Sequence, residues 1–316
     1  MATTATSSAS SEPVAVTRPA APLWRRIERY LLPAFTLLAL VYLMIPIAVM
    51  IVFSFNKPVG KFNYAWNEFS LEGWLHPFAW PGLGNSLITS LSVAVISTIV
   101  ATILGTMIGL ALTRYRFRGR GALNGLIFLP MATPEIVLGA SLLTLFVATA
   151  LPPVAGSVPR LYPTGFHTIV IAHVMFCISF VVVTVKARLA GFDRRLEEAA
   201  MDLGAGEWTT FRLITLPLLA PAILSAALLG FALSIDDFVI TYFVAGSTTT
   251  FPLFVWGAAR VSVPPQVNVI ASAIFLVSVL FMVGNVLWGL RAARRSREPL
   301  PQALPIPEAL PQPEAA

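Results

Sequence analysis

Long apolar runs separated by short polar links dominate the chain. A helix needs about 20 residues to cross the ~30 Å hydrocarbon core of a bilayer, and each run is about that long or longer. The runs are continuous, without the alternation of a barrel strand, and a helix satisfies its own backbone groups in lipid. The sequence therefore predicts an all-α membrane protein with six transmembrane helices. The predicted spans are Leu31–Phe55, Asn85–Thr113, Leu123–Ala150, Phe166–Val185, Leu218–Val244 and Val267–Leu290.

Composition supports a single membrane domain. Apolar residues make up 57% of the 316 residues and charged residues only 11%, against about 25% charged in a typical soluble domain. No segment between the spans is long enough to form a second core, so we expect one transmembrane domain over residues 23–296. Residues 1–22 are rich in Ala, Ser, Thr and Pro, and residues 297–316 are rich in Pro and Ala. Both compositions are typical of solvated, disordered tails.

The basic residues fall mostly on one side of the predicted bundle. When the links are assigned alternately to the two sides, only four of the 21 Lys and Arg residues lie on the opposite side. Those four are Lys57, Lys61, Arg160 and Arg260. The positive-inside rule then places both termini, and both tails, in the cytoplasm. The basic runs RYRFRGR and RAARRSR lie directly at the ends of apolar spans, so we interpret them as topology determinants and expect no nucleic-acid partner.

The link at residues 186–217, on the predicted cytoplasmic side, carries an amphipathic pattern. Small or apolar residues recur at i, i+3, i+4 and i+7, and acidic residues lie off that stripe. The stripe is Leu196, Ala199, Ala200 and Leu203, and the acids are Glu197, Glu198 and Asp202. Asp193 is a suitable N-cap, and Gly204 and Gly206 offer the positive φ that ends a helix. The pattern predicts a short helix outside the membrane, followed by a turn.

The same link resembles the signature of a known family. From Glu198 to Pro217 the chain reads EAA, three residues, Gly, nine residues, Ile, one residue and Leu-Pro. The fixed positions are Glu198, Ala199, Ala200, Gly204, Ile214, Leu216 and Pro217. This string resembles the signature of permease subunits of binding-protein-dependent ABC importers. The resemblance implies that the link is a coupling loop that docks in a groove of a separate ATPase subunit, and the alternative is an incidental amphipathic connector.

No nucleotide-binding or catalytic motif accompanies this signature. The sequence lacks GxxxxGK[ST], the phosphate-binding loop of ATPases. We therefore expect this chain to be no enzyme and to hold no cofactor, with ATP and Mg²⁺ on the partner ATPase that the resemblance implies. The single cysteine, Cys177, excludes a multi-cysteine metal site. His167 and His173 point about 120° apart on a helix, so we expect no metal site.

Three acids lie inside the predicted spans, where an ionisable group costs at least ~2.5 kcal/mol and marks a candidate functional site. They are Glu135 in the third span and Asp236 and Asp237 in the fifth. Because no Lys or Arg lies within the spans, we expect these acids to have no internal partner and to suit a cationic cargo. Tyr242 and Trp256 are near enough in sequence to add aromatic faces, which attract ammonium groups.

The two aspartates are expected to differ. On a regular helix they point about 100° apart. Asp237 shares a small, polar stripe with Gly230, Ser234 and Thr241, whereas Asp236 falls on an apolar one. We therefore expect Asp237 to line the cargo path more directly than Asp236. The alternative is that these acids pair with arginines or cap a broken helix near the surface.

Small residues and prolines predict local features of the spans. Gly105 and Gly109 form a small-xxx-small motif, which predicts a close helix crossing in the second span. Pro130 and Pro134 predict a kink in the third span.

A second resemblance concerns the cargo. The stretches LPMATPEIVLGASLL (129–143), ALSIDDFVITYFVAG (232–246) and FPLFVWGAARVSVPPQVNVI (251–270) are similar to segments of spermidine/putrescine permeases. The likeness runs from about residue 30 to residue 290. It implies the type I ABC importer permease fold, in a bacterial cytoplasmic membrane, with a polyamine as cargo.

The resemblance also implies partners. Six spans form half a pore in that family, so we expect a second, related permease chain, two ATPase copies inside and a soluble substrate-binding protein outside. The alternatives are an importer of another organic cation or amine-bearing solute, and a stand-alone secondary transporter or membrane enzyme. The last two need ion-coupling groups near the midplane of repeated halves, or a catalytic constellation, and neither pattern appears in the sequence.

Overall fold

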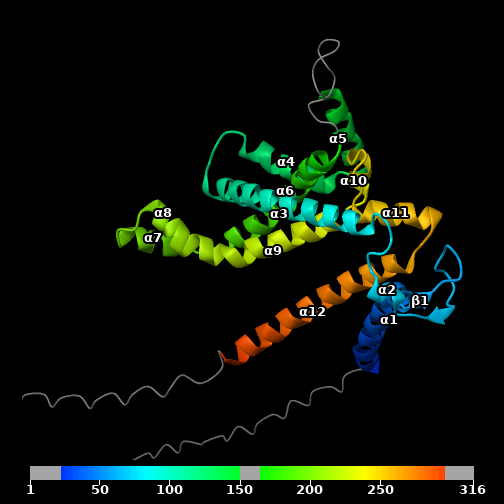
Figure 1. The fold of residues 1–316 in the computed structure, drawn as a ribbon. Coiled ribbons are helices and arrows are strands. Elements are labelled where there is room, and N and C mark those ends of the chain that lie inside the picture. The colour runs from blue at the N-terminus through cyan, green and yellow to red at the C-terminus, as the bar shows by residue number, and fades with distance from the viewer. Residues whose placement is uncertain (1–22, 150–163, 296–316) are drawn as a thin grey trace, which may run out of the picture. The chain divides into compact units, whose positions relative to one another are not determined.

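The computed structural model describes residues 23–149 and 164–295 and shows a mostly helical chain (Figure 1). The predicted tails, residues 1–22 and 297–316, lie outside the described residues, as does Arg160. The chain divides into two compact units, residues 1–52 and 53–316, and each is taken by itself below.

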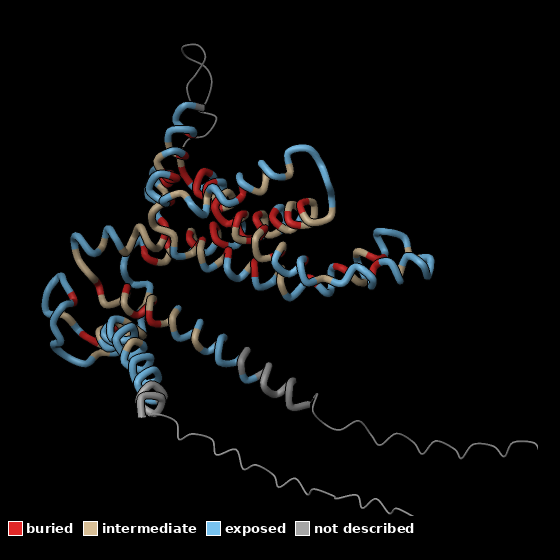
Figure 2. Tube along the Cα trace, turned by 180° about the vertical axis from the view of Figure 1, so that it is seen from behind, coloured by how far each residue is buried: buried red, intermediate tan, exposed pale blue. Residues whose placement is uncertain are grey.

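The first unit is essentially the helix α1 (Leu23–Phe53). Its stretch Tyr30–Phe53 is long and apolar enough to cross a membrane. Large apolar side chains are exposed along the helix, from Leu31 to Val52 (Figure 2). Lipid is the solvent in which such a surface is stable. This helix corresponds to the first predicted span.

The second unit consists of one small hairpin and a succession of helices. In the hairpin β1 (Asn56–Lys57) pairs antiparallel with β2 (Glu68–Phe69). The helices up to residue 149 are α2 (Glu72–Leu75), α3 (Leu83–Arg114), α4 (Arg120–Ala132) and α5 (Glu135–Thr149). Those from residue 166 on are α6 (Phe166–Ala190), α7 (Arg195–Asp202), α8 (Glu207–Thr210), the π-helical turn η1 (Phe211–Thr215), α9 (Leu216–Ile235), α10 (Val239–Val244), α11 (Phe251–Val261) and α12 (Pro265–Arg295).

Across the described residues of both units, five helices are long and apolar enough to span a membrane, and α4 with α5 makes a sixth if the pair is one broken span. The two helices of that pair meet at 109°. Thr133 between them is extended, with φ −81° and ψ 132°, because the following Pro134 disfavours a helical conformation in the residue before it. The kink expected in the third span is thus confirmed, but the expectation of one helix over residues 123–150 is wrong.

The fifth predicted span is broken as well. Helix α9 ends at Ile235 and α10 begins at Val239, so residues 218–244 do not form one helix. The break falls on the two aspartates that the sequence marks as candidate site residues.

The bundle of α3, α6 and α9 forms the centre of the second unit, and α10 packs against α5 and α6 (Figure 1). In Figure 2 the buried residues gather in this bundle. One large cluster of buried apolar side chains joins α3, α5, α6 and α10 through residues such as Val93, Leu142, Ile169 and Val244. A second cluster joins α6 and α9 through Val181, Val185 and Leu219.

Glycines let α3 approach α6 closely. A Cβ atom at Gly105 would lie 2.7 Å from Val181 Cγ1, and one at Gly109 would lie 3.3 Å from Val185 Cγ1. No real Cβ atom tolerates the first distance. The close crossing predicted from the small-xxx-small motif is therefore confirmed, with α6 as the partner helix.

Candidate transport path and coupling surface

Asp237 lies in the break between α9 and α10 and is held there by the first turn of α10. Its Oδ2 accepts hydrogen bonds from the Thr241 backbone N–H (2.8 Å) and the Thr241 hydroxyl (2.7 Å). Its Oδ1 accepts a longer one from the Ile240 N–H (3.4 Å). A carboxylate that accepts from the free N–H groups of a first turn acts as a helix cap, so Asp237 stabilises the start of α10.

His173 of α6 is the partner that the sequence did not lead us to expect. Its Nε2 lies 3.3 Å from Asp237 Oδ2, and only 3% of the His173 side chain and 6% of the Asp237 side chain are exposed. The expectation that the acids inside the spans have no internal partner is therefore wrong for Asp237. The usable signal was an imidazole in the middle of an apolar span, which is itself a candidate functional group.

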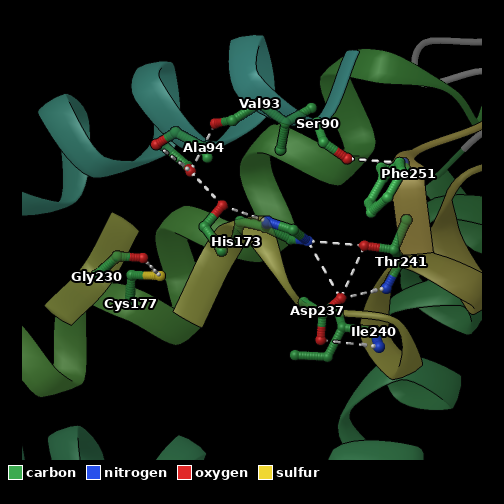
Figure 3. Close-up of polar contacts among 12 residues, drawn as sticks. Ser90, Val93, Ala94, His173, Cys177, Gly230, Asp237, Ile240, Thr241 and Phe251 are labelled. Atoms are coloured by element: carbon green, nitrogen blue, oxygen red, sulfur yellow. Dashed lines mark hydrogen bonds and ion pairs between the residues drawn. The ribbon is translucent and has the colours of Figure 1, made fainter. Parts of the chain in front are cut away.

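The histidine also ties four helices together (Figure 3). Its Nδ1 lies 2.7 Å from Ser234 Oγ on α9, and Ser234 Oγ lies 2.9 Å from Ser97 Oγ on α3. Its Nε2 lies 2.9 Å from Thr241 Oγ1 on α10. Because the Thr241 hydroxyl donates to Asp237, its oxygen can accept from an Nε2–H. This polar cluster, residues 97, 173, 234, 237 and 241, fixes the geometry of the break.

Asp236 and Glu135 are placed differently from Asp237. Asp236 is exposed, and its side chain accepts no hydrogen bond from another residue in the described part of the chain. Glu135 is exposed in the first turn of α5, where a negative charge is favoured by the helix dipole. Neither side chain belongs to the polar cluster.

Aromatic rings gather next to the break. The Phe238 ring centroid lies 5.7 Å from that of Tyr242 and 5.2 Å from that of Trp256 on α11. Tyr242 and Trp256 are both exposed. The Arg260 guanidinium carbon lies 4.5 Å from the Trp256 ring centroid, so a cation already rests on this aromatic surface. The structure thus brings Tyr242 and Trp256 together through Phe238.

The link at residues 186–217 forms the helix that the pattern predicts. Helix α7 carries Glu197 and Glu198 in its first turn, and Asp193 Oδ1 accepts a hydrogen bond from the Arg195 N–H (3.0 Å). Gly204 ends the helix with φ +87°, a conformation that favours glycine. The short helix and its glycine turn are confirmed.

Glu197 attaches this helix to the rest of the bundle. The Arg114 guanidinium, at the end of α3, donates to Glu197 Oε1 and forms an ion pair with it. The Thr215 hydroxyl, immediately before α9, donates to the same oxygen. Only 11% of the Glu197 side chain is exposed. The pattern placed Glu197 off the apolar stripe without indicating that it is buried.

The apolar stripe of α7 points away from the bundle. Leu196, Ala199 and Leu203 are exposed, with Leu203 90% exposed, and Glu198 is exposed beside them. A Cβ atom at Gly204 would meet nothing within 4 Å. The other positions of the signature are Ala200 and Ile214, which are half-buried, and Leu216 and Pro217, which are exposed. A cavity of about 600 Å³ opens beside this region, lined by Tyr115, Met201, Trp208 and Phe211 among others.

Five long apolar helices and the broken pair of α4 and α5 define a polytopic membrane protein. The chain belongs to the family of binding-protein-dependent transport system inner membrane components, whose model matches residues 101–297. It is accordingly a multi-pass permease subunit of the bacterial inner membrane and not an enzyme.

Curated relatives cover most of the chain. It is 38% identical over 255 residues to the spermidine/putrescine transport system permease protein PotC of Haemophilus influenzae, covering 80% of this chain and 94% of that one. It is 37% identical over 258 residues to the putrescine transport system permease protein PotI of Escherichia coli K12, covering 81% and 89%.

Solved structures share the fold. A bacterial ABC transporter involved in the import of the acidic polysaccharide alginate matches with a TM-score of 0.62 and 17% identity, covering 88% of this chain and 100% of that one. At this identity the likeness shows the fold alone. The expected ABC importer permease fold is confirmed.

Proposed function

We propose that this chain is one half of the membrane pore of an ATP-driven importer of polyamines. The observation that carries the proposal is the 38% identity to a spermidine/putrescine permease over 80% of the chain. The exposed acid and aromatic surface at the break of the fifth span support it, because charged amines are recognised by carboxylates and by ring faces.

The cargo path involves Asp236, Tyr242, Trp256 and Glu135, with Asp237 in a supporting role. Asp237 already uses both oxygens on His173 and α10, so an ammonium group would have to compete with four existing contacts. Asp236 is exposed and adjacent to the aromatic surface in sequence. Asp236 therefore offers the carboxylate to the cargo, and Asp237 fixes the backbone from which Asp236 projects.

The exposed face of α7 docks on a separate ATPase subunit. Small Ala199 and half-buried Ala200 permit close approach, and Leu203 supplies an apolar side chain that is 90% exposed. An amphipathic helix laid in a groove is a common mode of recognition. ATP and Mg²⁺ are held by that partner. The complete machine has two ATPase copies, a second and related permease chain and an extracytoplasmic substrate-binding protein, with both termini of this chain in the cytoplasm.

Reconstitution in lipid vesicles tests this function. The chain is purified with its ATPase, second permease and binding protein, and uptake of radiolabelled spermidine and putrescine is measured with and without ATP. We expect uptake that requires ATP and the binding protein. Uptake driven by an ion gradient in the absence of the ATPase would overturn the proposal.

A second candidate cargo is another organic cation or amine-bearing solute, because Asp236 and the aromatic surface recognise a charged amine rather than a particular chain length. Competition of unlabelled amines against labelled spermidine ranks these cargoes. ATP-dependent uptake of a neutral or acidic solute, with no competition by polyamines, would refute a cationic cargo.

A further inference from the structure

Glu197 is the only acid of α7 in the described structure that faces the bundle, and it contacts two transmembrane helices at once. Arg114 is the last residue of α3, and Thr215 is the last residue of η1, which leads directly into α9. Both donate to the same carboxylate oxygen. A single atom therefore joins the coupling helix to the cytoplasmic ends of α3 and α9.

The contacts around this junction are mutually supporting. The Arg114 guanidinium carbon also lies 5.9 Å from the Phe192 ring centroid, and Arg194 Nη2 donates to the Thr113 carbonyl at 3.3 Å. The ion pair is partly buried, with 26% of the Arg114 side chain and 11% of the Glu197 side chain exposed, and separating its partners leaves a poorly solvated charge on Glu197 without compensation. When α7 is displaced, the ends of α3 and α9 must move with it.

Helices α3 and α9 are also the two that hold the serine pair of the polar cluster. Ser97 lies on α3 and Ser234 on α9, two residues before the break at Asp236. A rigid helix carries a displacement along its length, so motion of the Thr215 end of α9 reaches the end at which Asp236 projects. Along this route, the Glu197 carboxylate is the side-chain group that contacts both α3 and the residue leading into α9.

We propose that Glu197 is a positioning residue that transmits movement of the ATPase-docked coupling helix to α3 and α9. This inference rests on the proposed coupling role of α7. It assigns to Glu197 a function distinct from docking, which belongs to the exposed Glu198 and Ala199 and the half-buried Ala200 of the same helix.

Glu197→Ala and Glu197→Gln are compared in the reconstituted four-component importer. The measurements are co-purification of the ATPase, ATP hydrolysis and labelled spermidine uptake, from which the ATP consumed per cargo is obtained. We expect co-purification and hydrolysis to be retained. Uptake should fall about tenfold for Glu197→Ala and less for Glu197→Gln, which keeps an acceptor oxygen but loses the charge. The ATP consumed per cargo should rise accordingly.

The matched control is Glu207→Gln, which removes the same charge from an exposed side chain in α8. It should leave the ATP consumed per cargo unchanged. The charge exchange Glu197→Arg with Arg114→Glu keeps the net charge of the loop and restores an ion pair of reversed polarity. We expect it to recover part of the uptake that either single exchange loses.

The outcomes separate two kinds of failure. A wild-type complex without ATP-dependent uptake would refute the proposed function. A working wild type in which both Glu197 variants keep the normal ATP consumed per cargo would refute the transmission role alone. Loss of ATPase co-purification in Glu197→Gln, without recovery in the charge exchange, would also refute it, because Glu197 would then merely shape the docking surface.

Discussion

Two acidic doublets, Glu197-Glu198 in α7 and Asp236-Asp237 after α9, divide their side chains in the same way. In each doublet one acid is buried and paired, and its neighbour is exposed. Glu197 accepts hydrogen bonds from Arg114 and Thr215. Asp237 accepts a hydrogen bond from Thr241 and contacts His173. In both places the exposed acid can contact a partner because its neighbour fixes the backbone.

The doublets differ in the local backbone. Glu197 and Glu198 lie on a regular helix, where successive side chains point about 100° apart, so that one faces the bundle and the other faces away from it. Asp236 and Asp237 lie at a helix break, where that geometry does not apply. Regular-helix geometry therefore favours Asp237 as the residue that lines the cargo path, whereas the structure places Asp237 in the polar cluster.

The largest expected effect concerns the proposed docking surface of α7, the helix that carries the first doublet. Ala200→Arg places a charge that the docked ATPase would have to desolvate without a counter-charge, at a cost of about 3–5 kcal/mol. We expect loss of ATPase co-purification by more than about 100-fold, with the permease still inserted in the membrane. Arg116→Gln, an exposed change outside α7, is the control. Normal co-purification by Ala200→Arg would show that this face of α7 is not the docking surface.

The next largest effect concerns Asp237, the buried acid of the second doublet, and its partner His173. His173→Leu removes the only imidazole within reach of Asp237 in the described structure and leaves a buried carboxylate with fewer donors, so we expect about 3 kcal/mol lower stability. Thermal unfolding of the purified permease in detergent measures it. His167→Leu, an exposed change on the same helix, should leave the melting temperature nearly unchanged. Equal melting temperatures for the two variants would contradict the structural role of His173.

Asparagine substitutions separate the two aspartates directly. Asp236→Asn should lower spermidine uptake about tenfold, because a charge-assisted contact with the cargo is lost, and should leave the melting temperature unchanged. Asp237→Asn should lower the melting temperature first. If Asp237→Asn lowers uptake in a fully stable protein and Asp236→Asn has no effect, then Asp237 contacts the cargo and Asp236 does not.

The smallest expected effect concerns the aromatic surface beside the second doublet. Trp256→Leu removes the largest ring face, and an exposed cation–π contact contributes about 0.5–1 kcal/mol. We expect the half-saturating concentration of cargo-loaded binding protein to stay unchanged, while turnover falls about two- to fivefold. Trp66→Leu, in the hairpin segment, is the matched control. An equal loss in both variants would indicate interfacial anchoring rather than contact with the cargo.

Much of the fold follows from the sequence because its causes are local. Run length and composition predict the apolar spans. Pro134 predicts the position of the bend between α4 and α5, and Gly105 with Gly109 predicts the close crossing on α6. Helix α7 and its turn at Gly204 follow from helical periodicity and from the backbone freedom of glycine.

The site was less predictable because its causes are distant in sequence. No proline or glycine occurs at residues 235–239 that would predict the break between α9 and α10. The break is stabilised by His173, 64 residues before Asp237, and by the new turn that Asp237 caps. Glu197 is buried by Arg114, 83 residues away. Periodicity places residues on one helix, but it does not say which face of that helix the bundle covers.

The uncovered stripe of α7 also bears on how long the protein persists in the cell. Leu203 is 90% exposed at the tip of the coupling loop, and Leu196, Met201 and Trp208 are exposed near it. Exposed apolar surface of this kind promotes aggregation and recognition by chaperones and proteases. We expect permease made in excess over its ATPase to be degraded, so that supply of the ATPase sets the abundance of the permease in the membrane.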